Sequence, residues 1–256
     1  MKLRIPTTLL ILLTSLPALA GTTAVPSFEQ PVSTSGDSSW FFRTAVYGWA
    51  QGLDGDLTIR NIPLPVDVGF DDILDDLDIA FMGAFEFGRD RWSILTDINY
   101  SELDSNVPLP PGSPLAAGDL SQQQVLANVL FFYQVAASDS YRFDVCAGAR
   151  FNWLEADLSA GPLTRSESKS WCDPIIGARL RMELSPSFYL RAAADIGGFG
   201  AASDLTWQTM AGIGWQFSEN GGAFLGYRAI GTDYTKGGFG YDVTAHGPII
   251  GAEFRF

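Results

Sequence analysis

The sequence has few of the residues on which small disulfide-rich domains and hydrolytic enzymes depend. It contains two cysteines and one histidine, and 16 lysines and arginines stand against 29 acidic residues in 256 positions. Two cysteines cannot build a disulfide framework or a cysteine-rich zinc site. A net charge of −13 argues against nucleic acid as a partner, and an apolar content of 46% argues against disorder. The length is typical of one large domain.

Long hydrophobic runs are also missing, except at the N-terminus. No other stretch has about 18 consecutive apolar residues, which excludes a helical membrane protein. Residues 1–20 combine Lys2 and Arg4 with an apolar stretch and the small-residue site Ala18-Leu19-Ala20, the pattern of a cleaved secretory signal peptide. Residues 21–39 are rich in Thr, Ser, Pro and Gly and predict a flexible periplasmic lead-in. The folded domain is expected over residues 40–256.

From Trp40 onward the dominant hydrophobic period is two, which indicates β-strands. Ten segments alternate in this way: Trp40–Gln51, Asp78–Gly88, Arg91–Leu103, Ser121–Ala136, Tyr141–Leu158, Trp171–Leu184, Ser187–Gly198, Asp204–Phe217, Gly222–Tyr234 and Val243–Phe256. Short connections alternate with mostly longer ones, as in outer-membrane barrels with periplasmic turns and external loops. The fold expected is an all-β, closed, antiparallel up-and-down transmembrane barrel of about ten strands. Eight or twelve strands stay open, because Ser121–Ala136 also fits a buried helix and residues 52–77 can hold further strand.

One face of these segments is apolar, and the other collects charges of both signs. After removal of the signal peptide only two lysines remain, whereas arginine, whose planar fork suits confined pairing with carboxylates, dominates the charged face. We therefore assign this face to the lumen and the apolar face to lipid. The predicted charged lumen residues are Arg43, Asp78, Glu86, Asp97, Asp144, Arg150, Arg179, Arg181, Glu183, Arg191, Asp195, Arg228, Glu253 and Arg255.

Aromatic residues near the segment ends support this orientation. Tryptophan and tyrosine rings commonly mark the two membrane interfaces of such barrels. The residues expected there are Trp40, Trp92, Tyr133, Trp153, Trp171, Trp207 and Trp215.

The last nine residues, 248–256, place Ile250, Ala252, Phe254 and Phe256 on one face and end in phenylalanine. This stretch resembles the C-terminal assembly signal of Gram-negative outer-membrane β-barrel proteins, with Phe254 and Phe256 as its aromatic positions. The resemblance implies an integral protein of the outer membrane, exported through the inner membrane and inserted by the barrel-insertion machinery. Outer-membrane lipids and lipopolysaccharide are the further partners it implies, and it transfers no catalytic residues.

Residues that carry chemistry are scarce. His246 shares the parity of lipid-facing residues, and only Asp242 or Ser203 are expected near it, so no catalytic residue is predicted. An acidic run (Asp67, Asp71, Asp72, Asp75, Asp76 and Asp78) lacks the spacing of a calcium loop and better fits a short helix, capped by Asp71, in the barrel mouth. No metal or cofactor is expected. The strand register places Cys146 opposite Glu183, far from Cys172, which predicts two free thiols.

A ten-strand barrel is narrow, and matched arginines and carboxylates would fill its lumen. The sequence therefore favours a structural or surface-interaction role with at most restricted permeation. A small-solute or ion channel gated by residues 52–77 is the alternative, and an outer-membrane hydrolase comes third. Acidic residues in the expected outer loops suggest divalent cations that bridge to lipopolysaccharide phosphates; these are Asp54, Asp56, Asp104, Asp119, Asp157 and Glu167. The sequence leaves the oligomeric state and any solute open.

Overall fold

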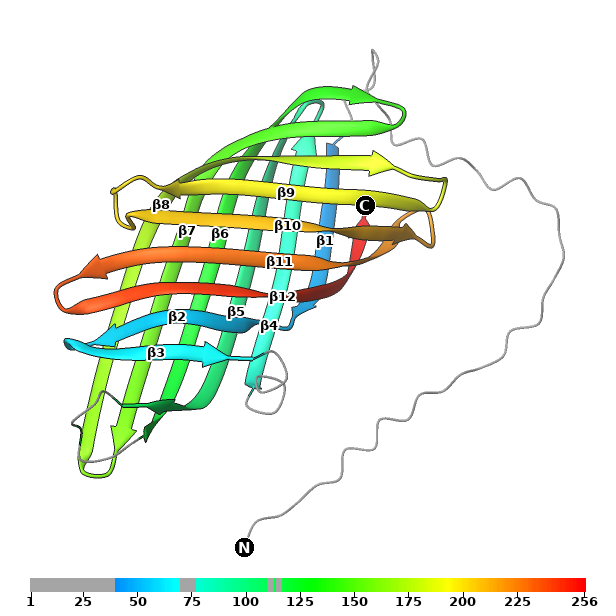
Figure 1. The fold of residues 1–256 in the computed structure, drawn as a ribbon. Helices are drawn as coiled ribbons and strands as arrows, with labels where there is room; N and C mark the ends of the chain where they lie inside the picture. The colour runs from blue at the N-terminus through cyan, green and yellow to red at the C-terminus, as the bar shows by residue number, and fades with distance from the viewer. Residues whose placement is uncertain (1–39, 70–76, 110–112, 114–116) are drawn as a thin grey trace, which may run out of the picture.

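A computed structural model describes residues 40–69, 77–109, 113 and 117–256, and Figure 1 shows its ribbon. The predicted signal peptide and lead-in lie outside these residues. The elements are β1 (Trp40–Trp49), β2 (Gly52–Ile59), β3 (Ile62–Val68), β4 (Leu77–Arg89), β5 (Trp92–Pro108), β6 (Ala117–Ser138), β7 (Tyr141–Ala160), β8 (Leu163–Glu183), β9 (Phe188–Gly198), β10 (Leu205–Gln216), β11 (Gly221–Lys236) and β12 (Phe239–Arg255). Among the described residues, no helix is long and apolar enough to cross a membrane.

Ten of these strands close a barrel. β1 pairs with β4 on one side and with β12 on the other, and β4 to β12 pair in chain order, all antiparallel. In Figure 1, β4 to β8 run steeply behind β9 to β12, which cross the view almost horizontally. The expected ten-strand count is confirmed for the closed ring. The segment Ser121–Ala136, for which a helix was the alternative, lies within strand β6.

The first long connection forms a hairpin that extends the barrel wall. β12 pairs with β1 through residues 249–255 and with β2 through residues 240–246, so the hairpin β2–β3 continues the sheet where β1 ends. Arg60 and Asn61 form its two-residue turn and both have positive φ, as a type I′ turn requires. Pro63 and Pro65 lie on β3, the last strand of the sheet order, where a missing N–H is tolerated. The predicted helix capped by Asp71 lies outside the described residues.

Most of the expected external loops are strand. β5, β6 and β8 extend several residues past their predicted bounds at this end, β7 continues to Ala160, and only residues 161–162 connect β7 to β8. Residues 237–238, two glycines with φ of 62° and 80°, connect β11 to β12. The prediction of long loops was wrong because the two faces of the strands exchange polarity at this end of the barrel. Here the inward positions are apolar and the outward positions are polar.

We call the half of the barrel beside the short turns the inner half, and the half that carries β2 and β3 the outer half. Large apolar side chains cover the outside of the inner half, and several are more than half exposed, including Val46, Val129, Leu225 and Ile250. Trp40, Trp92 and Trp215 lie on the same surface. A continuous exposed apolar surface with aromatic residues is the lipid-facing band of a membrane barrel.

The outer half has the reverse arrangement, with an apolar core enclosed by the barrel wall. The core joins the wall β5–β8 to the wall β3–β2–β12–β11 and contains Leu53, Leu57, Ile59, Leu64, Val66, Leu103, Val107, Leu120, Leu154, Ala156, Leu158, Trp171, Ile230, Tyr234, Phe239, Tyr241 and Val243. Leu57, Leu154 and Leu158 have no exposed surface. Trp171, expected at an interface, instead stacks on Tyr234 inside this core with ring centroids 4.2 Å apart. The outer half is therefore packed like the interior of a water-soluble protein.

Candidate functional site: the interior of the inner half

The inner half encloses a cavity of about 180 Å³. Ten of the 14 predicted lumen residues line it: Arg43, Glu86, Asp97, Asp144, Arg179, Arg181, Arg191, Asp195, Arg228 and Glu253. Arg150 is fully buried farther up the barrel, Glu183 pairs with Arg181, and the Arg255 guanidinium lies over the Phe41 ring. Asp78 lies at a register irregularity in β4, and its side chain falls outside the described structure.

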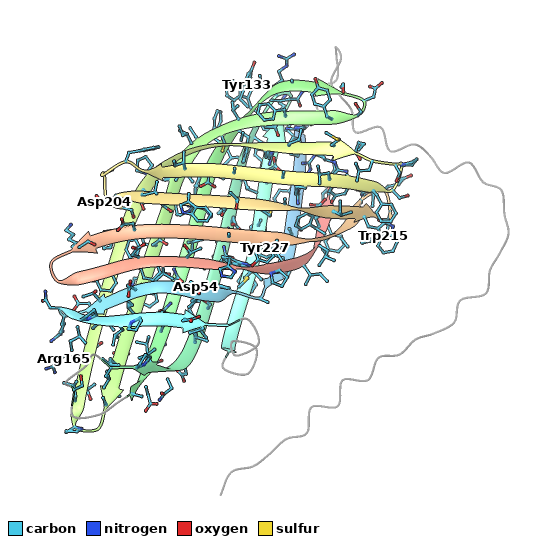
Figure 2. All side chains as sticks on the ribbon, viewed as in Figure 1. Asp54, Tyr133, Arg165, Asp204, Trp215 and Tyr227 are labelled. Carbon is cyan, nitrogen blue, oxygen red and sulfur yellow. The ribbon has the colours of Figure 1, made fainter. Side chains whose placement is uncertain are left out.

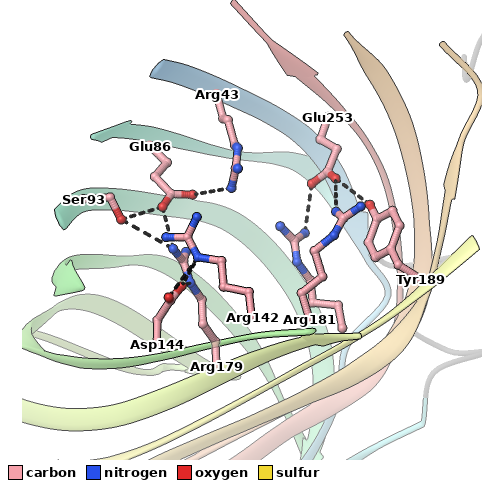
Figure 3. A network of polar contacts seen from close by, with 10 residues as sticks. Arg43, Glu86, Ser93, Arg142, Asp144, Arg179, Arg181, Tyr189 and Glu253 are labelled. Carbon is pink, nitrogen blue, oxygen red and sulfur yellow. Dashed lines mark hydrogen bonds and ion pairs between the residues drawn. The ribbon is translucent and has the colours of Figure 1, made fainter. Parts of the chain in front are cut away.

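One group of contacts is centred on two buried carboxylates. Glu86 Oε1 lies 2.6 Å from Arg179 Nη2 and accepts a hydrogen bond from the Ser93 hydroxyl, while its other oxygen lies 3.5 Å from Arg43 Nη1. Arg179 Nε also donates to Asp144, which accepts a second hydrogen bond from Arg142 Nε. Figure 3 shows Arg179 joining the two carboxylates. The planar guanidinium thus connects strands β4, β7 and β8 across the lumen.

A second group surrounds Glu253 on β12. Its two carboxylate oxygens accept hydrogen bonds from Tyr189 Oη at 2.5 Å and pair with Arg191 Nη1 at 3.0 Å (Figure 3). Arg181 Nη1 is 3.8 Å from the same carboxylate, and its guanidinium carbon is 3.4 Å from the centre of the Tyr189 ring. Aromatic faces attract cations in this geometry. These contacts hold β8, β9 and β12 together at the inner end.

On the side of the outer half, two deeply buried ion pairs form the closed end of the cavity, which we call its floor. Arg228 Nη2 pairs with Asp97 Oδ2 at 2.8 Å, and Arg228 also donates to Gln208 and to the hydroxyl of Tyr47, which itself donates to Asp97. Arg150 pairs with Asp195 at 2.7 Å and also donates to Asn128 and Thr206. Buried charges persist only when their hydrogen-bonding capacity is used in this way.

Two kinds of side-chain packing occupy the interior of the described barrel. Charge networks occupy the inner half, and the apolar core occupies the outer half. The predicted charge-filled lumen therefore describes only half of the barrel, because the inward positions turn apolar in the outer half; on β7 these are Leu154, Ala156 and Leu158.

Several interior residues were missed by sequence reasoning. Arg142 shares the parity of Asp144 and lines the cavity, and its position in the alternation was sufficient to predict this. Tyr47 and Tyr189 were missed because an aromatic ring at either parity reads as lipid-facing. Phe132, whose ring lies 3.8 Å from the Arg179 guanidinium carbon, was missed for the same reason.

His246 faces outward, as its parity predicts, but its expected partners were wrong. Its Nε2 lies 2.5 Å from Asp54 Oδ2 of β2, and its Nδ1 lies 2.7 Å from Tyr227 Oη of β11. Ser203 instead donates its backbone N–H and its hydroxyl to Asp173. Pairing of β12 with the unpredicted β2 strand brings Asp54 to the histidine. Figure 2 shows Asp54 and Tyr227 close together on the barrel wall.

The two thiols are free, as predicted, although the register differed from expectation. Cys146 lies opposite Gly177 rather than Glu183, and Cys172 lies opposite Phe151. Across residues 40–69, 77–109, 113 and 117–256 the structure holds no group of three or more His, Cys, Asp or Glu side chains with metal-binding geometry. The acidic run considered for calcium lies mostly outside those ranges.

Comparison with known proteins gives similarity of fold. No family model matches the sequence, and no curated protein does. Among solved structures, the outer-membrane protease OmpT of Escherichia coli aligns over 90% of this chain and 100% of its own, with 10% sequence identity and a TM-score of 0.57. The translocator domain of the autotransporter NalP from Neisseria meningitidis aligns over 88% of this chain and 90% of its own, with 13% identity and a TM-score of 0.44.

The closed ring of ten strands and its outward apolar band define the chain as an integral β-barrel protein of the outer-membrane type, and OmpT shares this fold. In such barrels the short turns face the periplasm, and by that rule the outer half lies on the cell-surface side.

Proposed function

We propose that the chain is a non-conducting barrel whose function lies on its cell-surface half, as a structural or surface-interaction protein. The observation that carries this proposal is the apolar core of the outer half. Leu57, Leu154 and Leu158 have no exposed surface there, so the described part of the interior above the membrane offers no continuous polar path. The part of the 52–77 segment that the structure describes contributes to this core, which speaks against its use as a channel gate.

The outer surface of β5–β8 has the regular polar pattern of an interaction surface. Its cross-strand rows are Glu102–Gln123–Glu155–Ser168, Asp104–Ser121–Asp157–Ser166 and Asn106–Asp119–Ser159–Thr164. In the first two rows a neutral residue separates the two carboxylates, which avoids direct repulsion across neighbouring strands. The surface is thus acidic and hydroxyl-rich, and a partner that carries cations or sugar hydroxyls matches its chemistry. Lipopolysaccharide bridged by divalent cations is one such partner.

The proposal includes the absence of enzymatic activity. The chain's one histidine, His246, faces outward on the barrel wall and does not line the cavity of the inner half. Its contacts with Asp54 and Tyr227 connect β2, β12 and β11, which is a structural task.

Planar-bilayer conductance of the signal-free protein tests the proposal. We expect no discrete current steps once insertion has been verified by protection of the barrel from added protease. The double variant Arg228→Met/Asp97→Leu is expected to stay silent, because the outer core still closes the interior. A general porin in the same bilayer serves as the positive control. Ion-selective steps from the wild-type protein would overturn the proposal and support the channel alternative.

A further inference from the structure

The cavity of the inner half exposes more positive than negative charge to an entering ligand. Six arginines and five carboxylates line it. The carboxylates of Glu86 and Asp144 are almost inaccessible, with 4% and 2% of their side-chain surface exposed. Arg43 and Arg191 retain 21% and 28%. Although the whole chain carries a charge of −13, the accessible groups in this cavity are therefore mainly guanidinium groups.

The strand register concentrates these arginines at the periplasmic end. Arg142, Arg181 and Arg191 occupy directly opposite positions on β7, β8 and β9, and Arg43 lies opposite Arg255 on β1 and β12. Like charges that face one another across strands destabilise a sheet. Glu86, Asp144, Glu183 and Glu253 offset part of this repulsion, but these four carboxylates are shared among five arginines, so positive charge remains in excess at this end. Among the described residues, Arg255 has an aromatic ring beside it and no carboxylate within ion-pair distance.

The cavity wall between these arginines and the floor is largely apolar. Leu95, Leu130 and Phe132 contribute from β5 and β6, and Met210 and Phe224 contribute from β10 and β11. These side chains also pack in two apolar clusters, and the surface they turn to the cavity offers carbon contacts that a purely ionic ligand would not use. A ligand with an anionic head and a short apolar body matches both parts of the cavity, since arginine forks bind oxyanions and the side chains beyond them bury carbon.

We propose that the inner half binds a small anionic amphiphile that enters from the periplasmic end, with its oxyanion held by the cavity-lining Arg43, Arg142, Arg181 and Arg191. Phosphate monoesters and carboxylates share this head-group chemistry. The site is independent of the proposed cell-surface function. The ligand enters and leaves on the same side of the membrane, and a barrel closed by its outer core can still bind it.

Calorimetric titration of the signal-free barrel in nanodiscs of zwitterionic lipid tests the proposal, with hexyl phosphate, hexanoate, inorganic phosphate and hexyltrimethylammonium as probes. We expect saturable binding of the two hexyl anions, weaker binding of inorganic phosphate, which lacks the apolar body, and no binding of the cation. The stronger of the two hexyl anions identifies the head group.

Variants separate a built site from general attraction of anions. Arg191→Gln is expected to weaken hexyl phosphate at least about tenfold, the effect of losing one charged hydrogen bond. Ala193→Phe changes no charge, fills the cavity beside Arg191 and is expected to abolish binding. Arg165→Gln at the far end of β8 makes the same charge change outside the cavity and is expected to bind as the wild type does.

Two results would overturn the proposal. One is the absence of saturable heat with both hexyl anions in the wild-type protein. The other is equal affinity in the wild type, Arg191→Gln and Ala193→Phe, which would place the anion elsewhere. The thermal transition of each variant in nanodiscs shows that it is folded, and the conductance experiment above tests the cell-surface function separately.

Discussion

The inner and outer halves of this barrel are built from the same strands, yet their polarities are opposite. On β7, the inward positions from Arg142 to Asn152 are mainly polar or charged and the outward ones are apolar. From Leu154 onward the inward positions are leucine and alanine, and the outward ones are Glu155, Asp157 and Ser159. The reversal takes place within one continuous strand without a break in its pairing to β6 and β8.

The comparison shows that the solvent outside the wall decides what the interior contains. In the inner half lipid covers the apolar face, so the enclosed space receives the polar face, and its charges must satisfy one another. In the outer half water surrounds the wall, so the apolar face turns inward and packs as a core. Figure 2 places Arg165 and Trp215 at opposite ends of the barrel, in these two environments.

The largest expected effect comes from a charge placed in the outer core. Leu158 has no exposed surface, so Leu158→Asp removes apolar packing and buries an unpaired carboxylate. We expect a loss of at least about 4 kcal/mol of unfolding free energy. Thr164→Asp, on the water-facing surface of β8 and opposite the neutral Ser159, is expected to change it by less than about 0.5 kcal/mol. Reversible denaturant unfolding in lipid vesicles measures both, and equal effects would contradict the two-sided description of the outer wall.

In the inner half, we expect the unfolding free energy to fall when one partner of an ion pair is lost rather than when apolar volume is lost. Arg228→Met leaves the buried Asp97 carboxylate without its cation and is expected to cost about 3–5 kcal/mol. The double variant Arg228→Met/Asp97→Leu removes both charges and should recover most of that loss. A double variant as unstable as the single one, in the same unfolding assay, would show that the charges themselves are not the reason.

The outward surfaces of the two halves should tolerate arginine differently. Val129 is 52% exposed in the apolar band, and Val129→Arg is expected to cost about 2–4 kcal/mol because the cation enters the hydrocarbon. Ser166 lies exposed on the outer part of β8, and Ser166→Arg is expected to change stability by less than about 0.5 kcal/mol. Similar costs at the two sites would show that the apolar band does not end between them.

The smallest effect on the unfolding free energy is expected at a contact between the β2–β3 hairpin and β8. The Lys169 side chain donates to Glu167 and lowers the pKa of that carboxyl, and Arg60 in the β2–β3 turn lies 3.5 Å from it. Because the folded-state pKa is the lower one, the stabilisation is complete above the ordinary value of 4.5 and is lost as the pH falls through the folded-state pKa.

Glu167→Gln therefore should cost less than about 1 kcal/mol at neutral pH, since the pair is near the surface. The difference from the wild type should vanish in unfolding measurements at a pH below the folded-state pKa. A difference that does not change with pH would assign the effect to packing instead of charge.

Much of the wall could be predicted from the sequence. Alternation with period two over Tyr141–Leu158 predicts both the strand and its lipid-facing side, because the bilayer imposes a strict rule on every outward residue. The charged inward residues follow from parity, and so would Arg142. The serine-rich stretch of β8 from Ser166 to Ser170 was not recognised as strand, because neither face of it carries the apolar residues by which a strand is detected.

The sequence by itself determined the class of fold, the approximate number of barrel strands and the face shared by most of the inward charged residues, since these depend on local alternation against a fixed solvent. Only the tertiary structure decided the partners. Asp54 meets His246 because β2 pairs with β12, and the arginines of β7, β8 and β9 meet at one level because the register aligns them. Pairing between distant segments is set by the closure of the whole barrel, which no local pattern records.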